Sequence, residues 1–294
     1  MIGFDVVAQS IVGGLLIGCV YALIAIGFTI LLGVVRYTNF AHGQLVMAAM
    51  FVSFTGLVTW GMNPLLVTIA AVLACALLAA VTYGALGRFA VQRPEGTQVV
   101  ATIGLLLIFQ SAATLIYGPT ARAGSTSYSN DVYSAFGLRI SQPGTWAAIV
   151  SVIAVGALMF FLHQTDFGRA MRATAENQTA AKLMGINTRR VYLAALVLAG
   201  SLEGLAGALL APTNVVSPFT GFTFILKAFV IVVIAGLGRV GGALIVGIAL
   251  GVVEALTNLY IGSELATAMV FVILIAALLF RPQGILGGAR AELV

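Results

Sequence analysis

Residues 8–32, AQSIVGGLLIGCVYALIAIGFTILL, contain no charged side chain. The run exceeds the roughly 20 mostly apolar residues that a helix needs to cross a bilayer, so it predicts a membrane-spanning helix. The whole chain shares this character, because 61% of its 294 residues are hydrophobic and 8% are charged. Soluble domains carry about 25% charged residues. We therefore exclude a soluble enzyme, a disordered chain and a coiled coil, and expect one all-α domain over residues 1–294, a polytopic transmembrane helical bundle.

Charged residues and turn signals divide the remaining chain into further apolar runs. One such signal is Trp60-Gly61-Met62-Asn63-Pro64, which separates two runs that no charge divides. We expect nine spans, or eight if the short run 222–237 does not cross. They are residues 8–32, 41–59, 64–87, 98–117, 145–163, 191–211, 222–237, 240–261 and 265–280.

The Lys and Arg residues predict an orientation, because the inner loops of membrane proteins are enriched in them. With the N-terminus outside and the C-terminus inside, 11 of the 14 basic residues fall in inner loops, two in outer loops and Lys227 within a span. If residues 222–237 turned back instead of crossing, eight basic residues would lie inside and five outside. The stronger bias with nine crossings favours nine. The net charge of +5 thus serves topology rather than nucleic-acid binding. The inner residues are Arg36, Arg88, Arg93, Arg169, Arg172, Lys182, Arg189, Arg190, Arg239, Arg281 and Arg290, and the outer ones are Arg122 and Arg139.

Two loops are long, the outer loop 118–144 and the inner loop 164–190. In the inner loop, Asp166 predicts an N-cap for a helix that starts at Phe167, and Asn177 an N-cap for a second helix over 178–184. Gly185 follows where a left-handed residue ends a helix. Ala180, Leu183 and Met184 form one apolar stripe. Such a helix either docks into a partner's groove or lies on lipid headgroups, and the residues alone leave both open.

The sequence offers no set of residues for catalysis. The Gly-Lys pair of a Walker A motif is absent, and the two histidines have no nucleophile and acid arranged around them. Gly236-x-Gly238-x-x-Gly241 spells a dinucleotide motif, but it joins two spans instead of a strand and a helix. Cys19 and Cys75 lie in apolar runs and are interpreted as packing residues. We expect no catalytic residue, no metal site and no cofactor.

Several polar residues lie within the apolar runs, where a charge costs roughly 2.5–3.5 kcal/mol on insertion scales. They either line a path for a solute or fix the register of neighbouring helices. Small-residue pairs four apart, such as Gly14/Gly18, Gly200/Gly204 and Gly247/Gly251, are interpreted as close helix packing within the chain. The candidate pathway residues are Asn39, His42, Gln44, Gln110, Glu203, Lys227 and Glu254.

Several motifs, in order along nearly the whole chain, resemble those of LivH-type permeases, the membrane subunits of ABC importers for branched-chain amino acids. They are Thr38-Asn-Phe-Ala-His-Gly43, Ala101-Thr-Ile-Gly-Leu105, Lys227-Ala-Phe229, Gly236-Leu-Gly238 with Gly242-Ala243, Glu254 and Phe280-Arg-Pro-Gln-Gly284. The resemblance implies uptake of a small polar solute by ATP-driven alternating access across a bacterial inner membrane. It also implies two ATP-binding subunits, a sister permease in a heterodimer and an extracytoplasmic solute-binding protein.

The resemblance gives the inner loop a role as the ATPase coupling segment. Such permeases dock their ATPases through a helix of the pattern E-A-A-x-x-x-G, and here Thr179-Ala180-Ala181-x-x-x-Gly185 has the spacing with Thr in place of Glu. This match favours docking over a position on the lipid surface. The candidate coupling residues are Arg169, Arg172, Glu176, Ala180, Ala181, Leu183, Met184 and Gly185.

Other solutes and mechanisms stay open at this point. The turn 235–242 departs from the family pattern, with Arg239 for a small polar residue and Gly241 for a proline. Relatives that carry urea, short amides or another amino acid have similar permeases. A secondary transporter with Glu203, Lys227 and Glu254 as an ion relay, and a membrane scaffold without transport, are the alternatives from other classes.

Overall fold

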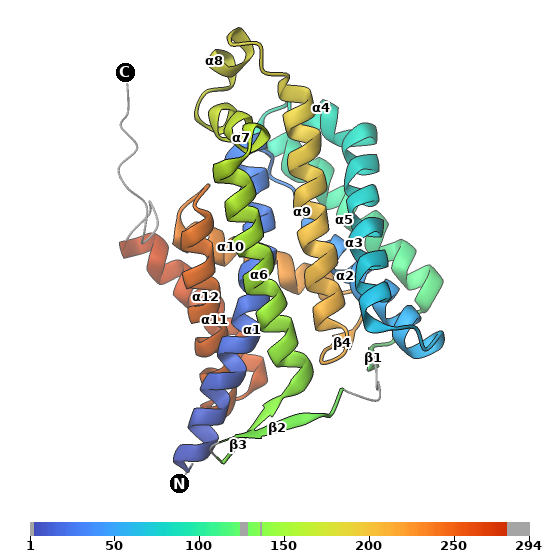
Figure 1. The fold of residues 1–294 in the computed structure, drawn as a ribbon, viewed down its shortest axis with the longest axis vertical. Coiled ribbons are helices and arrows are strands. Elements are labelled where there is room, and N and C mark those ends of the chain that lie inside the picture. Colours follow the sequence, from blue (N-terminus) through green and yellow to red (C-terminus); the bar gives the residue numbers. More distant parts are fainter. Residues whose placement is uncertain (1–2, 124–128, 136, 281–294) are drawn as a thin grey trace.

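Long helices account for most of the residues that the computed structural model describes, which are 3–123, 129–135 and 137–280 (Figure 1). The helices are α1 (Phe4–Ile30), α2 (His42–Phe54), α3 (Pro64–Thr82), α4 (Arg88–Ala90), α5 (Glu95–Tyr117), α6 (Gln142–Gln164), α7 (Asp166–Glu176), α8 (Gln178–Leu183), α9 (Thr188–Leu210), α10 (Thr220–Ala235), α11 (Val240–Tyr260) and α12 (Ser263–Phe280). Helices α1, α2 and α3 continue into the π-helical turns η1 (Leu31–Val35), η2 (Thr55–Thr59) and η3 (Tyr83–Gly87). Two short antiparallel pairs, β1 (Arg122–Ala123) with β4 (Val215–Val216) and β2 (Val132–Ala135) with β3 (Leu138–Ser141), lie at the end that holds the N-terminus.

The apolar runs of the sequence become the helices of the bundle. Seven described segments are long and apolar enough to cross a membrane, and two further apolar helices, Thr220–Ala235 and Leu265–Phe280, are shorter. The short predicted run 222–237 corresponds to α10, which has 16 residues. The prediction of a polytopic helical bundle is thereby confirmed. Arg281, Arg290 and the last four residues of the ending motif, 281–284, lie outside the described residues.

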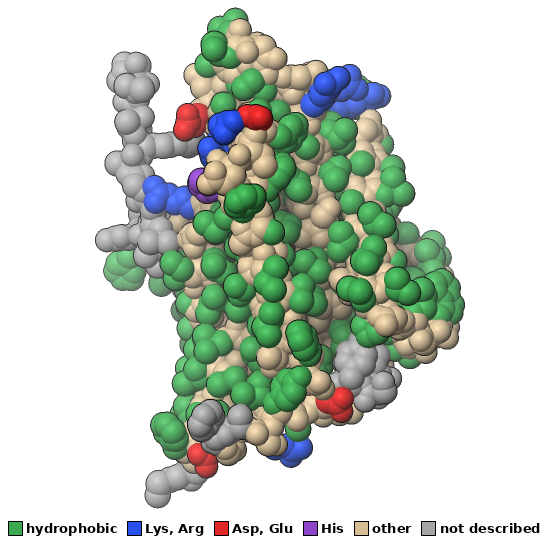
Figure 2. Space-filling view, viewed as in Figure 1, with side chains coloured by type: hydrophobic (Ala, Val, Ile, Leu, Met, Phe, Trp, Pro, Cys, Tyr) green, Lys and Arg blue, Asp and Glu red, His purple; other side chains and the backbone are tan. Residues whose placement is uncertain are grey.

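The flanks of the bundle are apolar, as a lipid environment requires. On α3 and α5, Leu65, Leu73, Val100 and Leu115 are each more than half exposed. Figure 2 shows hydrophobic side chains over the flank of the visible face, whereas Lys, Arg, Asp and Glu side chains lie toward the two ends. This distribution is the inverse of a soluble protein's and explains why so few charged residues suffice.

Glycines allow two pairs of helices to touch backbone to backbone. A Cβ atom at Gly18 of α1 would lie 2.7 Å from the Cα of Ile248 in α11. A Cβ at Gly204 of α9 would likewise lie 2.7 Å from the Cα of Val72 in α3. The interpretation of the small-residue pairs as packing within the chain is therefore confirmed. Cys75, which is buried beside Gly204 and donates to the Leu45 carbonyl at 3.3 Å, is a packing residue of the same interface.

The two glycine contacts belong to one crosswise arrangement. Helix α1 is followed by α2 and α3, and α9 by α10 and α11, and each first helix packs against the third helix of the other unit. Helix α1 runs away from the strand end and α9 runs toward it (Figure 1), so the two units have opposite directions. Inverted units of this kind recur in transporters.

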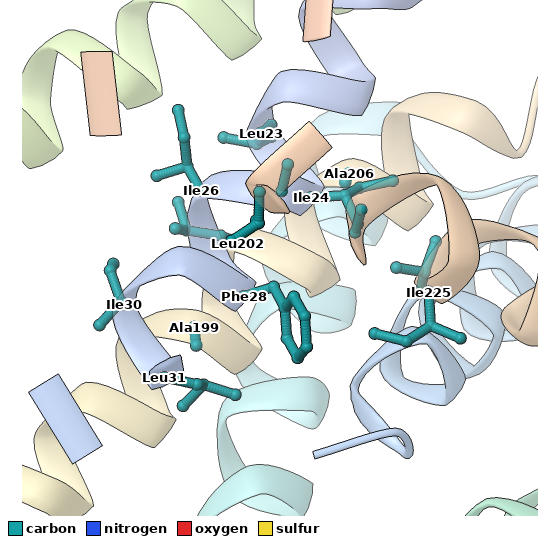
Figure 3. Close-up of a cluster of buried hydrophobic side chains, with 14 of the residues drawn as sticks. Leu23, Ile24, Ile26, Phe28, Ile30, Leu31, Ala199, Leu202, Ala206 and Ile225 are labelled. Atoms are coloured by element: carbon teal, nitrogen blue, oxygen red, sulfur yellow. The ribbon is translucent and has the colours of Figure 1, made fainter. Parts of the chain in front are cut away.

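The apolar core lies where α1, α9 and α10 meet. Figure 3 shows Leu23, Phe28 and Leu31 of the α1–η1 segment facing Leu202 of α9 and Ile225 of α10. Phe28, Leu23 and Ile225 are wholly buried. This core fixes the helices that carry the buried polar residues described next.

The chain between η1 and α2 is irregular rather than helical. The Thr38 amide donates to Gln98 Oε1 at 3.1 Å, and the Phe40 amide donates to Thr102 Oγ1 at 3.2 Å. Side chains of α5 thus replace the helical hydrogen bonds that this backbone lacks, which is a condition for irregular backbone inside an apolar bundle. Helix α2 then begins at a wholly enclosed residue, His42.

Candidate functional site

His42, at the start of α2, faces Glu203 in α9. Their atoms Nε2 and Oε1 are 2.6 Å apart, and the two side chains are 1% and 0% exposed. The imidazole also stacks on Phe28, with ring centroids 5.6 Å apart. Gly27 makes room for the pair, because a Cβ there would lie 2.9 Å from Glu203 Oε1. The partner of Glu203, which the sequence left open, is thus His42 and not Lys227.

The first turns of α2 and α10 meet beside this pair. A Cβ at Gly43 would lie 2.2 Å from the Gly221 carbonyl oxygen, so the two backbones touch. Gln44 is wholly buried against Gly221, and neither its amide nitrogen nor its amide oxygen has a hydrogen-bond partner among the described residues. Helix N-termini carry positive partial charge, which favours the nearby Glu203 carboxylate. Unsatisfied buried groups are rare, so a polar solute or a water in this position would find ready partners.

Lys227 of α10 lies in a second polar cluster with α1 and α11. Its Nζ atom is 2.6 Å from Glu254 Oε1, donates to the Tyr21 hydroxyl at 2.8 Å and lies 4.4 Å from the Tyr21 ring centroid. The lysine and glutamate side chains are 10% and 20% exposed. Lys227 therefore pairs inside the protein instead of extending to water, and an ion pair is cheaper to bury than a lone charge.

The two remaining candidates are placed differently. Asn39 is buried, and its Oδ1 accepts a hydrogen bond from the Ala41 amide at 3.0 Å, so it shapes the backbone just before α2. Gln110 lies half-buried on α5 and belongs to neither polar cluster. The structure thus pairs His42 with Glu203, places Gln44 of the same helical turn against α10, and pairs Lys227 with Glu254 in a separate cluster.

Sequence reasoning missed three residues that hold these groups. Tyr21 binds Lys227, whereas Gln98 and Thr102 support the irregular segment before α2. The last two are polar residues four apart near the start of an apolar run. That spacing places both side chains on one face of a helix, and it is the sequence pattern from which this pair of residues could have been predicted.

The inner loop folds into α7 and α8. Thr165, not Asp166, is the N-cap of α7, because the Thr165 hydroxyl accepts from the Gly168 amide and Asp166 is already the first helical residue. The prediction of an Asp166 cap was wrong, since both residues are good caps and the helix begins one residue earlier. Asn177 caps α8 as predicted, accepting from two backbone amides at 3.0 Å. Gly185 has the expected left-handed φ of 83°.

Helix α8 presents apolar side chains outward. Leu183 and Met184 are each 83% exposed, and Ala180 is also exposed. Figure 2 shows hydrophobic side chains at the outermost tip, where Figure 1 places α8. Ala181, by contrast, is 4% exposed. The stripe predicted from Ala180, Leu183 and Met184 is thus an accessible surface, whereas Ala181 packs inward, and whether this surface docks a partner stays a prediction.

The charged coupling candidates Arg169, Arg172 and Glu176 lie in α7 rather than in α8. Arg169 pairs with Asp166 in solvent, and Arg172 donates to the Leu162 carbonyl near the end of α6. Glu176 is exposed at the last position of α7. Because a Cβ at Gly168 would lie 2.4 Å from the Phe161 carbonyl oxygen, α7 is fitted closely onto α6. A displacement of α8 and α7 would therefore reach α6.

A cavity of about 980 Å³, which we call the α7 cavity, opens at the same end of the molecule. Residues of η1, α5, α6, α7 and α10 and of the turn 236–239 line it, among them Arg36, Glu95, Arg172, Glu176, Phe229 and Val233. Gly236 and Gly238 have left-handed φ angles of 92° and 81°, so the turn that departs from the family pattern is built on these glycines. Phe229 stacks on Phe40, with ring centroids 6.3 Å apart.

The sequence has close relatives over nearly its whole length. A family profile described as the permease component of the branched-chain amino acid transport system matches residues 10–278. The high-affinity branched-chain amino acid transport permease LivH of Salmonella typhimurium is 33% identical, over 97% of both chains. BraD of Pseudomonas aeruginosa, with the same description, is 31% identical over 97% of both chains. LivM of Escherichia coli, another permease of such a system, is 30% identical over 61% of this chain and 43% of LivM.

Proposed function

This chain belongs to the family of branched-chain amino acid transport permeases, and from that premise we propose that it is the membrane subunit of an ABC importer that carries branched-chain amino acids into the cell. One observation supports this most strongly: the identity of 31–33% extends over 97% of relatives that carry this description. The path for the solute passes the buried polar residues of α2, α9 and α10. No bond of the solute is broken.

The importer contains other chains. We assign it two ATP-binding subunits, a sister permease that pairs with this chain in a heterodimer, and an extracytoplasmic solute-binding protein. The relation to LivM, a second permease type with the same overall description, supports a sister permease. Hydrolysis of ATP takes place on the partner subunits, and α8 with its exposed Leu183 and Met184 is the contact that transmits it.

The proposed orientation places the N-terminus outside and α7 and α8 in the cytoplasm of a bacterium, beneath the inner membrane. Arg36, Arg88 and Arg190 lie at or near helix ends on the α7–α8 side, and Arg172 lies within α7, which agrees with the bias of basic residues toward the cytoplasm. The two strand pairs then face outward, toward the solute-binding protein.

Transport follows alternating access. Closure of the ATP-binding subunits pulls on α8, and α7 passes the displacement to α6 through Arg172 and the close fit at Gly168. The crosswise packing of α1 on α11 and of α9 on α3 lets each unit move as a body. Helix α2 is the shortest of α1–α3, and α10 is the shortest of α9–α11. These two helices touch at Gly43 and Gly221, so the two units are also in contact there.

The test is uptake of labelled L-leucine into proteoliposomes that contain this chain together with its genomic neighbours. We expect accumulation that needs the solute-binding protein outside and ATP on the side of α8. A proton or sodium gradient without ATP should drive none, because Glu203 and Lys227 sit in separate pairs instead of forming a relay. Uptake driven by a gradient alone, or a purified complex without ATP-binding subunits, would refute the proposal.

A further inference from the structure

The α7 cavity has two kinds of lining. Phe229 and Val233 of α10 and Ile30 of α1 give it an apolar wall, and all three are buried or half-buried. Arg36 and Glu95, from the end of the α1–η1 segment and the start of α5, place charges of opposite sign at its edge. The volume of about 980 Å³ is at the upper end of the range of about 300–1,000 Å³ for pockets that hold small molecules.

The edge charges are available to a ligand. Arg36 and Glu95 are exposed, and neither forms an ion pair with a described residue. Arg36 is held in the left-handed conformation, with φ of 55°, so the backbone itself sets where its side chain starts. Arg172, which also lines the cavity, is already bound to the Leu162 carbonyl and is assigned to structure.

A branched-chain amino acid matches this lining group by group. It carries a carboxylate, an ammonium and a short aliphatic side chain, whereas an anionic lipid headgroup would match the arginines but not Glu95 and Glu176. A guanidinium recognises a carboxylate, a glutamate recognises an ammonium, and the aliphatic group gains from contact with apolar residues. The cavity is larger than one amino acid, so it holds the solute together with water.

We propose that the α7 cavity is a cytoplasmic binding site for the transported amino acid within this single chain. Arg36 binds the carboxylate, Glu95 the ammonium, and Phe229 and Val233 the aliphatic side chain. Phe229 of the lining stacks on Phe40, which lies two residues before His42 of the buried polar pair. The inference rests on the proposed function, and its consequence is that solute accumulated inside occupies the site and slows import.

The experiment measures import by proteoliposomes of the whole complex with L-leucine, leucinamide or N-acetyl-leucine sealed inside. We expect internal L-leucine to inhibit import of labelled leucine. Leucinamide lacks the carboxylate charge and N-acetyl-leucine lacks the ammonium, so each should need about ten-fold more for half inhibition. Import unaffected by internal leucine would overturn the inference and leave the proposed function standing. Absence of ATP-driven import altogether would defeat the proposed function and the inference with it.

Variants locate the effect in the cavity. Arg36→Gln and Glu95→Gln should each raise the internal leucine concentration for half inhibition about five-fold, whereas Arg88→Gln, at the same end but outside the lining, should not change it. Val233→Trp places a bulky ring on the apolar wall where the aliphatic side chain would bind and should reduce import about ten-fold with the complex still assembled, and Ile245→Trp, on an exposed site of α11, is its matched control. Equal behaviour of cavity variants and controls would overturn the inference.

Discussion

The interior of the bundle and its α8 end each place side chains in surroundings that they do not prefer, since polar groups lie among apolar helices in the first and apolar groups are exposed in the second. In the interior, His42 and Glu203 are enclosed by apolar helices, and at α8 Leu183 and Met184 are 83% exposed. The interior groups have found partners inside the chain, whereas the α8 groups have none among the described residues. The difference separates groups that are paired within this chain from groups that are accessible to another surface, and variants in the two regions should divide accordingly.

The largest effect on stability is expected from breaking the pair of His42 and Glu203. The change His42→Leu leaves a wholly buried carboxyl group without its partner, which costs about 3 kcal/mol. Thermal unfolding of the purified protein in detergent measures the loss. The double variant His42→Leu with Glu203→Leu removes both groups and should recover most of the stability without recovering import. A single variant as stable as the double one would contradict the role of the pair.

The next largest effect is expected where two backbones touch. Gly204→Val places side-chain atoms against the Val72 Cα and the Ala71 carbonyl oxygen, which lie 2.7 Å and 2.8 Å from the first added carbon. Overpacking of this kind costs about 1–3 kcal/mol. Gly104→Val on α5 is the matched control, because no atom lies within 4 Å of a Cβ at that position. The unfolding temperatures of the two variants compare the sites, and equal values would mean that α9 and α3 are not so closely packed.

A smaller loss is expected at the second polar cluster. The change Lys227→Met removes the partner of Glu254, whose side chain is 20% exposed and can regain part of its hydration. We expect a cost of about 1–2 kcal/mol, below that of His42→Leu, because partial exposure screens the remaining charge. Tyr21→Phe removes only the hydroxyl that accepts from Lys227 and should cost less still. A Lys227 variant less stable than the His42 variant would reverse the ranking of the two clusters.

Local patterns predicted much of the fold, whereas contacts between distant segments stayed out of reach. The apolar runs gave the helices, and Asn177 and Gly185 gave the ends of α8, because each signal depends on neighbours in sequence. The pairing of Glu203 with His42 instead of Lys227 depends on how α2 and α9 cross, which no local pattern encodes. The inverted arrangement of the two helical units likewise depends on the direction and packing of distant helices.

The candidate site shows the same division. Residue type alone identified His42, Glu203, Lys227 and Glu254, since polar groups in apolar runs are conspicuous. Ala181 became a candidate through the spacing of the family motif and lay outside the apolar stripe of Ala180, Leu183 and Met184, and the structure places it inward at 4% exposure. The role of Tyr21 was not predicted, because a tyrosine inside a span resembles an ordinary packing residue. Only the structure shows Lys227 beside its hydroxyl.

The smallest effect on stability, and the sharpest contrast with the interior, is expected at α8. Leu183→Asp and Met184→Asp change side chains that are 83% exposed. The free energy of unfolding should therefore change by no more than a surface substitution usually causes, about 0.5 kcal/mol, and the unfolding temperature should stay nearly the same. If α8 docks into an ATP-binding subunit, a carboxylate in that apolar contact should lower recovery of the subunit in co-purification at least ten-fold and abolish leucine import. Lys182→Asp, on the same helix but off the stripe, controls for charge alone and should have the weaker effect. Full recovery of the ATP-binding subunit with both Asp variants would mean that the exposed stripe of α8 serves another surface, such as the lipid headgroups, and would remove the distinction between the two regions.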